Sequence, residues 1–191
     1  MLTIEGIKNC LTTRFIGTDI YLFDAIDSTN DHAHKLAKQG AKEGTIVLAE
    51  SQSKGKGRLG RTWFSPSGAN IYLSVILRPQ MPTSQITLLT FAAAIAVARA
   101  IRDVTGLDAD IKWPNDILIK GKKVAGILSE MGAKSDTIRF VVIGIGINVN
   151  LDKKDIPSEL MDKAISIKIE SNNAIDRMNL ICRVLENLEK W

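Results

Sequence analysis

Ile117-Leu118-Ile119-Lys120-Gly121-Lys122-Lys123-Val124-Ala125-Gly126-Ile127-Leu128 is the stretch that sets the architecture of the chain. Two apolar, β-branched runs, 117–119 and 124–128, flank the turn sequence 120–123, and this pattern predicts a β-hairpin. A hairpin joins neighbouring antiparallel strands. The sheet that contains it is therefore expected to be antiparallel at this point.

Working outward from the hairpin, the same pattern predicts further strands. Apolar runs indicate strands over 21–26, 45–49, 70–77, 111–113, 137–150 and 164–169. Helical periodicity and capping residues indicate helices over 27–39, 84–104 and 174–191. The region 51–68 is rich in glycine and basic residues and is expected to be a long loop. Many hairpins and few helices predict an α+β fold, with helices packed on a mixed, largely antiparallel sheet.

Length and composition are those of an ordinary globular protein. The chain has 191 residues, of which 45% are hydrophobic and 24% charged, so we expect one domain over 1–191 and exclude a disordered or fibrous chain. Cys10 and Cys182 form no C-x-x-C pattern, which argues against a structural zinc site. We find no signal peptide, and the apolar run 88–98 is too short to cross a bilayer. These features predict a cytoplasmic protein without membrane contact.

The positive charge of the chain is concentrated in one place. The net charge is +4, from 25 basic and 21 acidic residues. Lys54, Lys56, Arg58 and Arg61 supply four positive charges with no acid between them, so the remainder of the chain sums to zero. We call residues 52–63 the basic loop. Such a concentration predicts a bound anion, and the loop is expected to become ordered when the anion binds.

Gly55-Lys56-Gly57-Arg58-Leu59-Gly60 matches the pattern G-x-G-x-x-G, which also occurs in dinucleotide-binding folds. That interpretation requires a helix directly after the third glycine, and 61–66 does not resemble a helix start. The chain has neither a P-loop motif nor the kinase motifs. A solvated basic loop, or a patch that binds RNA phosphates beside Trp63 and Phe64, remains open at this point.

Six segments, taken in order, resemble biotin protein ligases and together span 27–150. They are Asp27-Ser28-Thr29-Asn30, the basic loop, Ser65 to Ser74, Lys112-Trp113-Pro114-Asn115-Asp116, Lys123 to Leu128, and Gly144-Ile145-Gly146-Ile147-Asn148. Each segment is short, but all six in order are specific.

The resemblance implies a catalytic domain of the biotin and lipoate ligase group, related in fold to class II aminoacyl-tRNA synthetases. Its reaction joins biotin to ATP, giving biotinoyl-5′-AMP and pyrophosphate, with Mg²⁺ as the metal. A lysine of a biotin carboxyl carrier protein then takes the biotinoyl group. We expect no N-terminal helix-turn-helix and no specific DNA binding. A small C-terminal barrel domain is expected to be missing or truncated, and a homodimer is a possible assembly.

The resemblance also implies a role for each matching residue. Lys123 and Arg58 would be catalytic, because cations are needed where the biotin carboxylate meets the α-phosphate. Residues implied to bind biotin are Ser28, Thr29, Asn30, Gln52, Gly126, Leu128 and Lys123. Residues implied to bind ATP or the adenylate are Lys56, Gly57, Arg58, Arg61, Trp63, Asp116 and Asn148, with Asp116 as the metal ligand. Gly144 and Gly146 would let the backbone approach the ligand.

Each assignment has a plainer alternative. Ser28 is also a good helix N-cap, Lys123 is also a charge beside a turn, and Asp116 is also a turn residue. Two other functions stay open: a lipoate-type acyl-adenylating ligase and a non-enzymatic nucleic-acid-binding module. The set of hydroxyls and amides at residues 28–30 and 52 favours biotin, because its ureido ring both donates and accepts hydrogen bonds.

Overall fold

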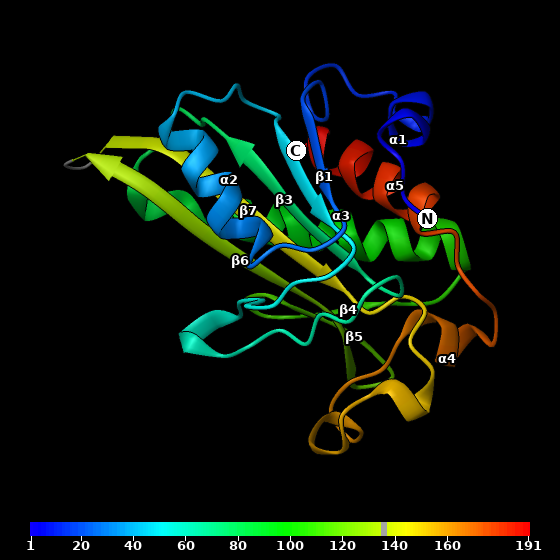
Figure 1. Cartoon of the computed structure of the whole chain (residues 1–191). Coiled ribbons are helices and arrows are strands. Elements are labelled where there is room, and N and C mark those ends of the chain that lie inside the picture. The colour runs from blue at the N-terminus through cyan, green and yellow to red at the C-terminus, as the bar shows by residue number, and fades with distance from the viewer. Residues whose placement is uncertain (135–136) are drawn as a thin grey trace.

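A single sheet of seven strands runs through the molecule in the order β1-β2-β3-β7-β6-β5-β4 (Figure 1). The computed structural model describes residues 1–134 and 137–191. The strands are β1 (Ile20–Phe23), β2 (Ile46–Ala49), β3 (Ile71–Leu77), β4 (Asp110–Lys112), β5 (Asp116–Ile119), β6 (Lys122–Lys134) and β7 (Thr137–Ile147). β1 pairs with β2 in parallel, and the other neighbours are antiparallel. The predicted mixed, largely antiparallel α+β fold is confirmed.

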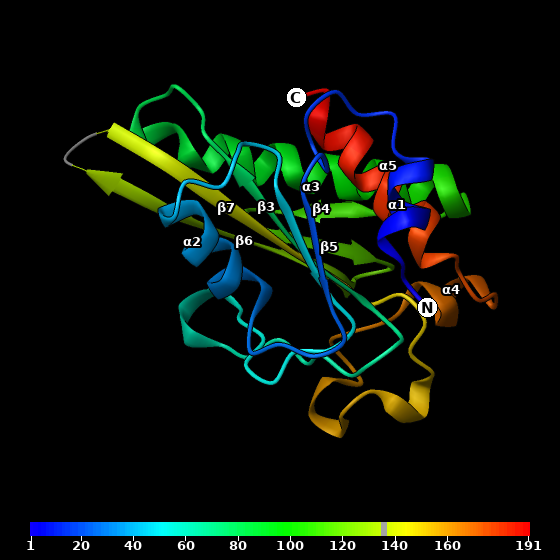
Figure 2. The ribbon, with the colours of Figure 1, turned by 45° about the horizontal axis from the view of Figure 1, so that its top comes forward.

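Helices cover both faces of this sheet (Figure 2). One face carries α2 (Thr29–Lys38), and the other carries α3 (Ile86–Thr105) and α5 (Arg177–Glu189), with α1 (Ile4–Cys10) beside α5. Side chains alternate across the strands, so Ile46 and Leu48 join the core under α3 and α5, whereas Val47 joins the smaller core under α2. A short helix, α4 (Ile167–Ser171), precedes α5. Single 3₁₀ turns lie at Arg58–Gly60, Thr83–Gln85, Lys153–Asp155 and Ser158–Leu160.

The helical stretch Thr83–Thr105 has the length and apolar composition that a membrane span would need, with a mean hydropathy of 1.6. Core helices of globular domains meet the same criteria. One side of α3 is buried against the sheet and α5, through Ala93, Ala94, Ala96, Val97, Ala100 and Ile101. This packing fits the predicted buried helix.

The predicted hairpin is present but tighter than expected. Lys120 and Gly121 form the turn, with φ of 47° and 78°, the left-handed conformation that a two-residue hairpin needs. Lys123 therefore lies on β6 itself and not in the turn. β6 also continues to Lys134, well beyond the predicted end at Leu128, because all of β7 pairs with it, from Ala125 to Lys134.

The predicted strand over 164–169 is wrong apart from its first residue. Ala164 forms a single bridge to Lys123, and the chain then enters α4. Ser166 causes the change, since its hydroxyl accepts a hydrogen bond from the Ile169 N–H and caps the helix. The alternating isoleucines at 165, 167 and 169 imitate a strand pattern. Helix α1 near the N-terminus was not predicted.

Cys10 and Cys182 form a disulfide that joins α1 to α5, with their Cα atoms 6.2 Å apart. The sequence suggested no pairing for these residues. Because disulfides persist mainly in oxidising compartments, this bond does not support the predicted cytoplasmic location.

Candidate functional site

Two cavities meet at the end of the sheet where the basic loop crosses the strands. The first, with a volume of about 50 Å³, is lined by the predicted biotin-binding residues Ser28, Thr29, Asn30, Gln52, Gly126 and Leu128. The second, of about 560 Å³, is lined by Arg61, Asp116 and Asn148 from the predicted nucleotide set. Gly57, Arg58, Trp63, Asn115 and Lys123 line both. The structure thus brings both predicted sets together, with the two predicted catalytic cations at the junction.

Three polar residues of the first cavity, Ser28, Thr29 and Asn30, are buried, and hydrogen bonds hold them in place. Thr29 donates from its backbone N–H and its hydroxyl to Gln52 Oε1, at 2.8 and 3.1 Å. Ser74 donates to Asn30 Oδ1 at 2.6 Å. Ser28 caps α2 by accepting from the Asp31 N–H, which confirms its predicted capping role. A fixed set of hydroxyls and amides presents donors and acceptors to a ligand without rearrangement.

Ser74 was not among the predicted site residues, although a signal for it exists. It is the one hydroxyl in the apolar sequence of β3 after Tyr72 and is completely buried. A buried polar residue needs a partner, and Asn30 supplies it. The contact joins residues 44 positions apart, so the sequence shows the need but not the partner.

Gly144 and Gly146 leave room for the side chains of Asn30 and Trp63, which pack directly on them. A Cβ atom at Gly144 would collide with the Asn30 amide, and one at Gly146 would lie 2.5 Å from Cε2 of Trp63. The indole of Trp63 thereby packs on β7 and lines the first cavity. Its Nε1 is buried and has no hydrogen-bond partner among residues 1–134 and 137–191. An unsatisfied buried donor in a cavity is available to a ligand.

Lys123 is fixed at the junction by its backbone and its ammonium group. Its N–H donates to the Lys163 carbonyl at 2.8 Å, and its carbonyl accepts from the Ile165 N–H at 3.0 Å. Nζ lies 2.7 Å from Asp116 Oδ1 and 5.2 Å from the centre of the Trp63 ring. Asp116, the predicted metal ligand, is therefore the ion-pair partner of the predicted catalytic lysine.

Arg58 is held by Asn115, a residue of the motif 112–116 for which the sequence predicts no role. Arg58 Nη1 donates to Asn115 Oδ1 at 3.0 Å. Asn115 in turn donates from Nδ2 to the Ile127 carbonyl and accepts from the Ile127 N–H through its own carbonyl, at 3.0 and 2.9 Å. Asn115 therefore ties the guanidinium group to β6.

The basic loop is a small hairpin whose lysines pair with acids elsewhere in the chain. The Gly57 N–H donates to the Arg61 carbonyl at 2.7 Å, and the Trp63 N–H donates to the Gly55 carbonyl at 2.8 Å. Lys54 Nζ lies 2.9 Å from Asp27 Oδ2, and Lys56 forms an ion pair with Asp31. The loop itself contains no acid, but the fold supplies acids from α2 and the turn before it.

The segment that follows β7 forms one wall of the second cavity, and it was also missed. Leu151, Ile156, Pro157 and Leu160 line that cavity with apolar side chains, together with Arg58 and Arg61. Asn148, predicted to read adenine, lines the cavity but uses its Nδ2 to donate to the Ile165 carbonyl at 3.2 Å. Lys56, also predicted to bind the nucleotide, lines the first cavity and not the second.

Comparison with known proteins gives this arrangement a family. The sequence model of the Biotin/lipoate A/B protein ligase family matches residues 22–148. The bifunctional ligase/repressor BirA of Bacillus spizizenii is 47% identical over 189 residues, which are 99% of this chain and 58% of that protein. The biotin–[acetyl-CoA-carboxylase] ligase of Paracoccus denitrificans is 43% identical, over 86% of this chain and 69% of the relative. The chain thus spans somewhat over half the length of BirA.

Solved structures agree with the sequence comparison. The biotin protein ligase of Aquifex aeolicus, in complex with biotin and ATP, superposes with a TM-score of 0.77 at 30% identity, over 91% of this chain and 69% of that one. The biotin protein ligase of Leishmania major, in complex with biotinyl-5-AMP, gives a TM-score of 0.72 at 26% identity, over 91% and 76%. With a family model that covers most of the chain and a fold that agrees, the chain belongs to the biotin/lipoate A/B protein ligase family.

Proposed function

We propose that the chain is the catalytic part of a biotin protein ligase that activates biotin with ATP. A biotin carboxylate oxygen forms a bond to the α-phosphorus of ATP, the bond to the bridging oxygen breaks, and pyrophosphate leaves. The main support for this proposal is the junction of the two cavities, where Lys123 and Arg58 line both. Two anions meet there in the proposed reaction, and fixed cations offset their repulsion as negative charge develops.

Each cavity suits one substrate. The hydroxyls and amides of the first cavity match the N–H and carbonyl groups of a ureido ring. Nε1 of Trp63, which has no hydrogen-bond partner among the described residues, is a further donor beside them. The second cavity combines Arg61 with the apolar wall at Leu151 and Ile156, which suits phosphates and a flat base. A lipoate-type substrate is disfavoured because its dithiolane ring has no group to pair with residues 28–30.

In the second step, the amine of a carrier lysine attacks the acyl carbonyl, an amide bond forms, AMP leaves and a proton is released. The relative from Paracoccus denitrificans is named as a ligase of acetyl-CoA carboxylase, and we propose a biotin carboxyl carrier protein of that kind as the acceptor. The Lys123–Asp116 pair orients the ammonium until the substrate anions compete for it.

Mg²⁺ is proposed as a companion of ATP and not as a resident ion. The described ranges 1–134 and 137–191 contain no group of three His, Cys, Asp or Glu residues that could hold a metal. A single carboxylate fits Mg²⁺, which keeps waters and binds substrate phosphates, and Asp116 would hold it. Bound there, the ion would neutralise phosphate charge.

We also propose a homodimer, supported by an open sheet edge. β5 pairs with β6 only as far as Gly126, so the remainder of β6 has β7 on one side and no strand on the other among the described residues. Open edges are sites of strand pairing between chains. Light scattering at several concentrations tests this proposal.

A cytoplasmic location and the absence of DNA and membrane binding stay predictions.

The decisive experiment is to incubate the full chain with ATP, Mg²⁺ and either biotin or lipoate, and to identify the adenylate by mass spectrometry. We expect biotinoyl-5′-AMP and pyrophosphate in equal amounts. Lipoyl-AMP formed in preference would support the alternative ligase. Salt-dependent binding of nucleic acid without consumption of ATP would support a binding module instead.

A further inference from the structure

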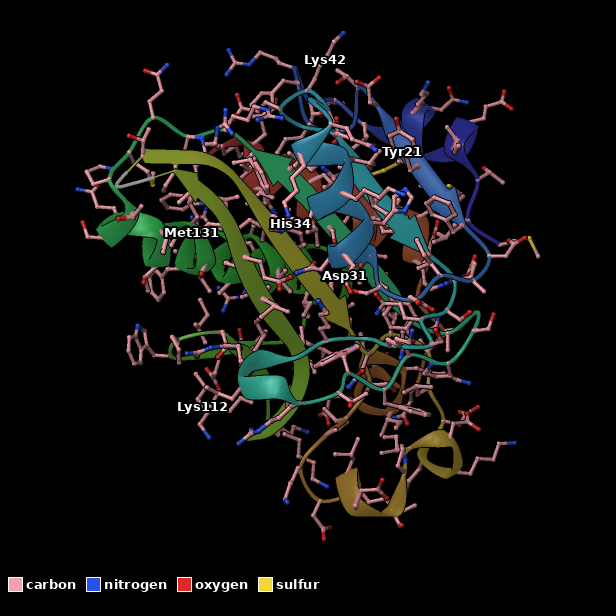
Figure 3. The ribbon with its side chains drawn as sticks, turned by 60° about the vertical axis from the view of Figure 1, so that its left-hand side comes forward. Tyr21, Asp31, His34, Lys42, Lys112 and Met131 are labelled. Atoms are coloured by element: carbon pink, nitrogen blue, oxygen red, sulfur yellow. A yellow bond between two sulfur atoms is a disulfide. The ribbon has the colours of Figure 1, made fainter. Side chains whose placement is uncertain are left out.

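Lys56 of the basic loop lies between two carboxylates that no sequence motif pointed to. Its Nζ forms an ion pair with Asp31 in the first turn of α2 and lies 3.9 Å from Glu130 Oε1 on β6. The hydrogen bond to Asp31 raises the pKa of Lys56 above its ordinary value, against the desolvation that lowers it, and Glu130 adds to the rise. Figure 3 shows Asp31 at the end of α2 nearest the basic loop.

Glu130 connects this lysine to the floor of the first cavity. Its second oxygen, Oε2, accepts a hydrogen bond from Asn30 Nδ2 at 2.8 Å. Asn30 Oδ1 already accepts a hydrogen bond from the Ser74 hydroxyl, so the two contacts together set the orientation of the amide. One carboxylate thus links a buried cavity residue to a lysine of the loop above it.

The cavity that Lys56 lines separates it from the two arginines of the loop. Arg58 and Arg61 line the second cavity, whereas Lys56 does not. Lys56 also forms the β-bridge with Thr62 that holds the two arms of the loop hairpin together. Holding Lys56 therefore holds Arg58, two residues further on, above the junction.

We propose that Asp31 and Glu130 are positioning residues that keep the basic loop closed over the junction by holding Lys56. The inference rests on the proposed function, because its consequence is retention of biotinoyl-5′-AMP. A closed loop excludes water from the anhydride and slows its release. The side chains of Lys56, Asp31 and Glu130 are 40%, 53% and 34% exposed. Each ion pair therefore has a modest effect, and the two pairs act together.

The test compares Glu130→Gln, Asp31→Asn and the double variant with the wild-type chain. Each protein is incubated with biotin, ATP and Mg²⁺ without a carrier, and rapid filtration separates free from bound biotinoyl-5′-AMP. We expect the free fraction to rise about threefold in each single variant and about tenfold in the double variant. A glutamine at 130 still accepts from Asn30, so biotin affinity stays within about twofold of wild type.

Asp108→Asn is the matched control. Asp108 pairs with Arg102 at 3.0 Å on α3, so the variant removes one carboxylate charge from an exposed pair outside both cavities. Adenylate retention should not change. A second readout needs no turnover: trypsin should cut within the basic loop faster in Glu130→Gln and Asp31→Asn than in the control.

Two results overturn the inference. One is a double variant in which the free fraction of biotinoyl-5′-AMP and the rate of tryptic cleavage in the basic loop are both unchanged. The other is a fall in biotin affinity that matches the rise in escape, because it would place the role of Glu130 in the biotin cavity. A wild-type chain that forms no adenylate would contradict the proposed function instead, and the proteolysis result would then decide the inference alone.

Discussion

At the scale of single residues, Lys123 combines a fixed backbone with a side chain at the meeting point of both cavities. Two hydrogen bonds to residues 163 and 165 hold its main chain, and Asp116 holds its ammonium. We expect Lys123→Ala to lower the rate of biotinoyl-5′-AMP formation by at least about 100-fold, since a transition-state charge contact is lost. Single-turnover synthesis followed by mass spectrometry measures this rate.

The neighbouring Lys122 provides the control for this prediction. Its Nζ donates to the Met161 carbonyl at 3.2 Å, away from the junction. Lys122→Ala should keep the rate of adenylate formation within about threefold of wild type, the effect of losing one exposed hydrogen bond. Equal losses in the two variants would mean that a general change of charge, and not the position of Lys123, controls the reaction.

Gly146 is required by the indole packed on it. A Cβ atom there would lie 2.5 Å from Trp63 Cε2, so Gly146→Ala forces the indole or the strand to move. We expect a loss of about 1–3 kcal/mol in the free energy of unfolding, the usual cost of overpacking. Urea denaturation of Gly146→Ala in the wild-type and Trp63→Leu backgrounds measures the coupling. A loss of the same size in both backgrounds would show that Trp63 is not the obstacle.

At the scale of elements, the basic loop shows how charges that repel in the sequence find partners in the fold. Lys54 and Lys56 lie close to each other in the chain, but Asp27 and Asp31 neutralise them. Ser53 and Lys54 hold the pKa of Asp27 below its ordinary value by hydrogen bonding to the carboxylate. The loop hairpin has hydrogen bonds of its own, yet most of its side chains face solvent.

From this balance we expect the loop to respond to substrates. We expect backbone amides over 54–63 to exchange with deuterium more slowly when biotin and ATP are both present, because phosphate contacts of Arg58 and Arg61 add to the existing ion pairs. Helix α5, which lines neither cavity, serves as the internal reference that should not change. Protection that is equal with and without the substrates would contradict a closing role for the loop.

Local sequence signals predicted the elements whose ends are decided by a few adjacent residues. The hairpin could be predicted because Lys120-Gly121 suits a tight turn, and α2 because Ser28 caps it. The segment 164–169 could not, because its isoleucines fit a strand equally well and the outcome depends on Ser166, whose hydroxyl also donates to the Leu151 carbonyl at 2.7 Å. The full length of β6 depends on pairing with β7, which no local pattern reveals.

The same distinction applies to the candidate site. The cavity residues within the six motifs could be placed, because each motif carries several of them. Ser74 and Glu130 could not be assigned, since their contacts to Asn30 join positions 44 and 100 residues apart. Asp116 illustrates a third case: the resemblance implied a carboxylate in the nucleotide set, but its pairing with Lys123 depends on β5 and β6 lying side by side.

At the scale of the whole molecule, a buried ion pair connects the N-terminal segment, the sheet and α5. Glu50 and Arg177 side chains are 8% and 10% exposed, with Nη1 of the arginine 2.6 Å from Oε2. Leu2 N–H donates to the other oxygen at 3.0 Å. Burial acts to raise the pKa of Glu50, but the bonds from Arg177 and Leu2 outweigh it and the net direction is downward.

A lowered carboxylate pKa stabilises the fold above the pKa of the unfolded chain, and that stability is lost as the pH falls through the folded value. We therefore expect the free energy of unfolding to fall below about pH 4.3, and Glu50→Gln to flatten this part of the profile. Urea titrations between pH 3 and pH 7 measure it. At pH 7, Glu50→Gln should cost about 3–5 kcal/mol, because Arg177 stays buried without its partner. Profiles of the same slope in both proteins would contradict the assignment.

The disulfide between Cys10 and Cys182 constrains the largest part of the chain, since its ends are 172 residues apart. A cross-link that closes so long a loop removes conformational freedom from the unfolded chain, and such bonds typically contribute about 2–4 kcal/mol. For a domain of this size, we expect reduction to lower the melting temperature by about 5–10 °C. Thermal unfolding with and without dithiothreitol measures the shift. Cys10→Ser, which cannot form the bond, should melt at the temperature of the reduced wild type and should not respond to dithiothreitol. A wild-type melting temperature that dithiothreitol leaves unchanged, with both thiols shown to be free, would contradict the pairing of α1 with α5.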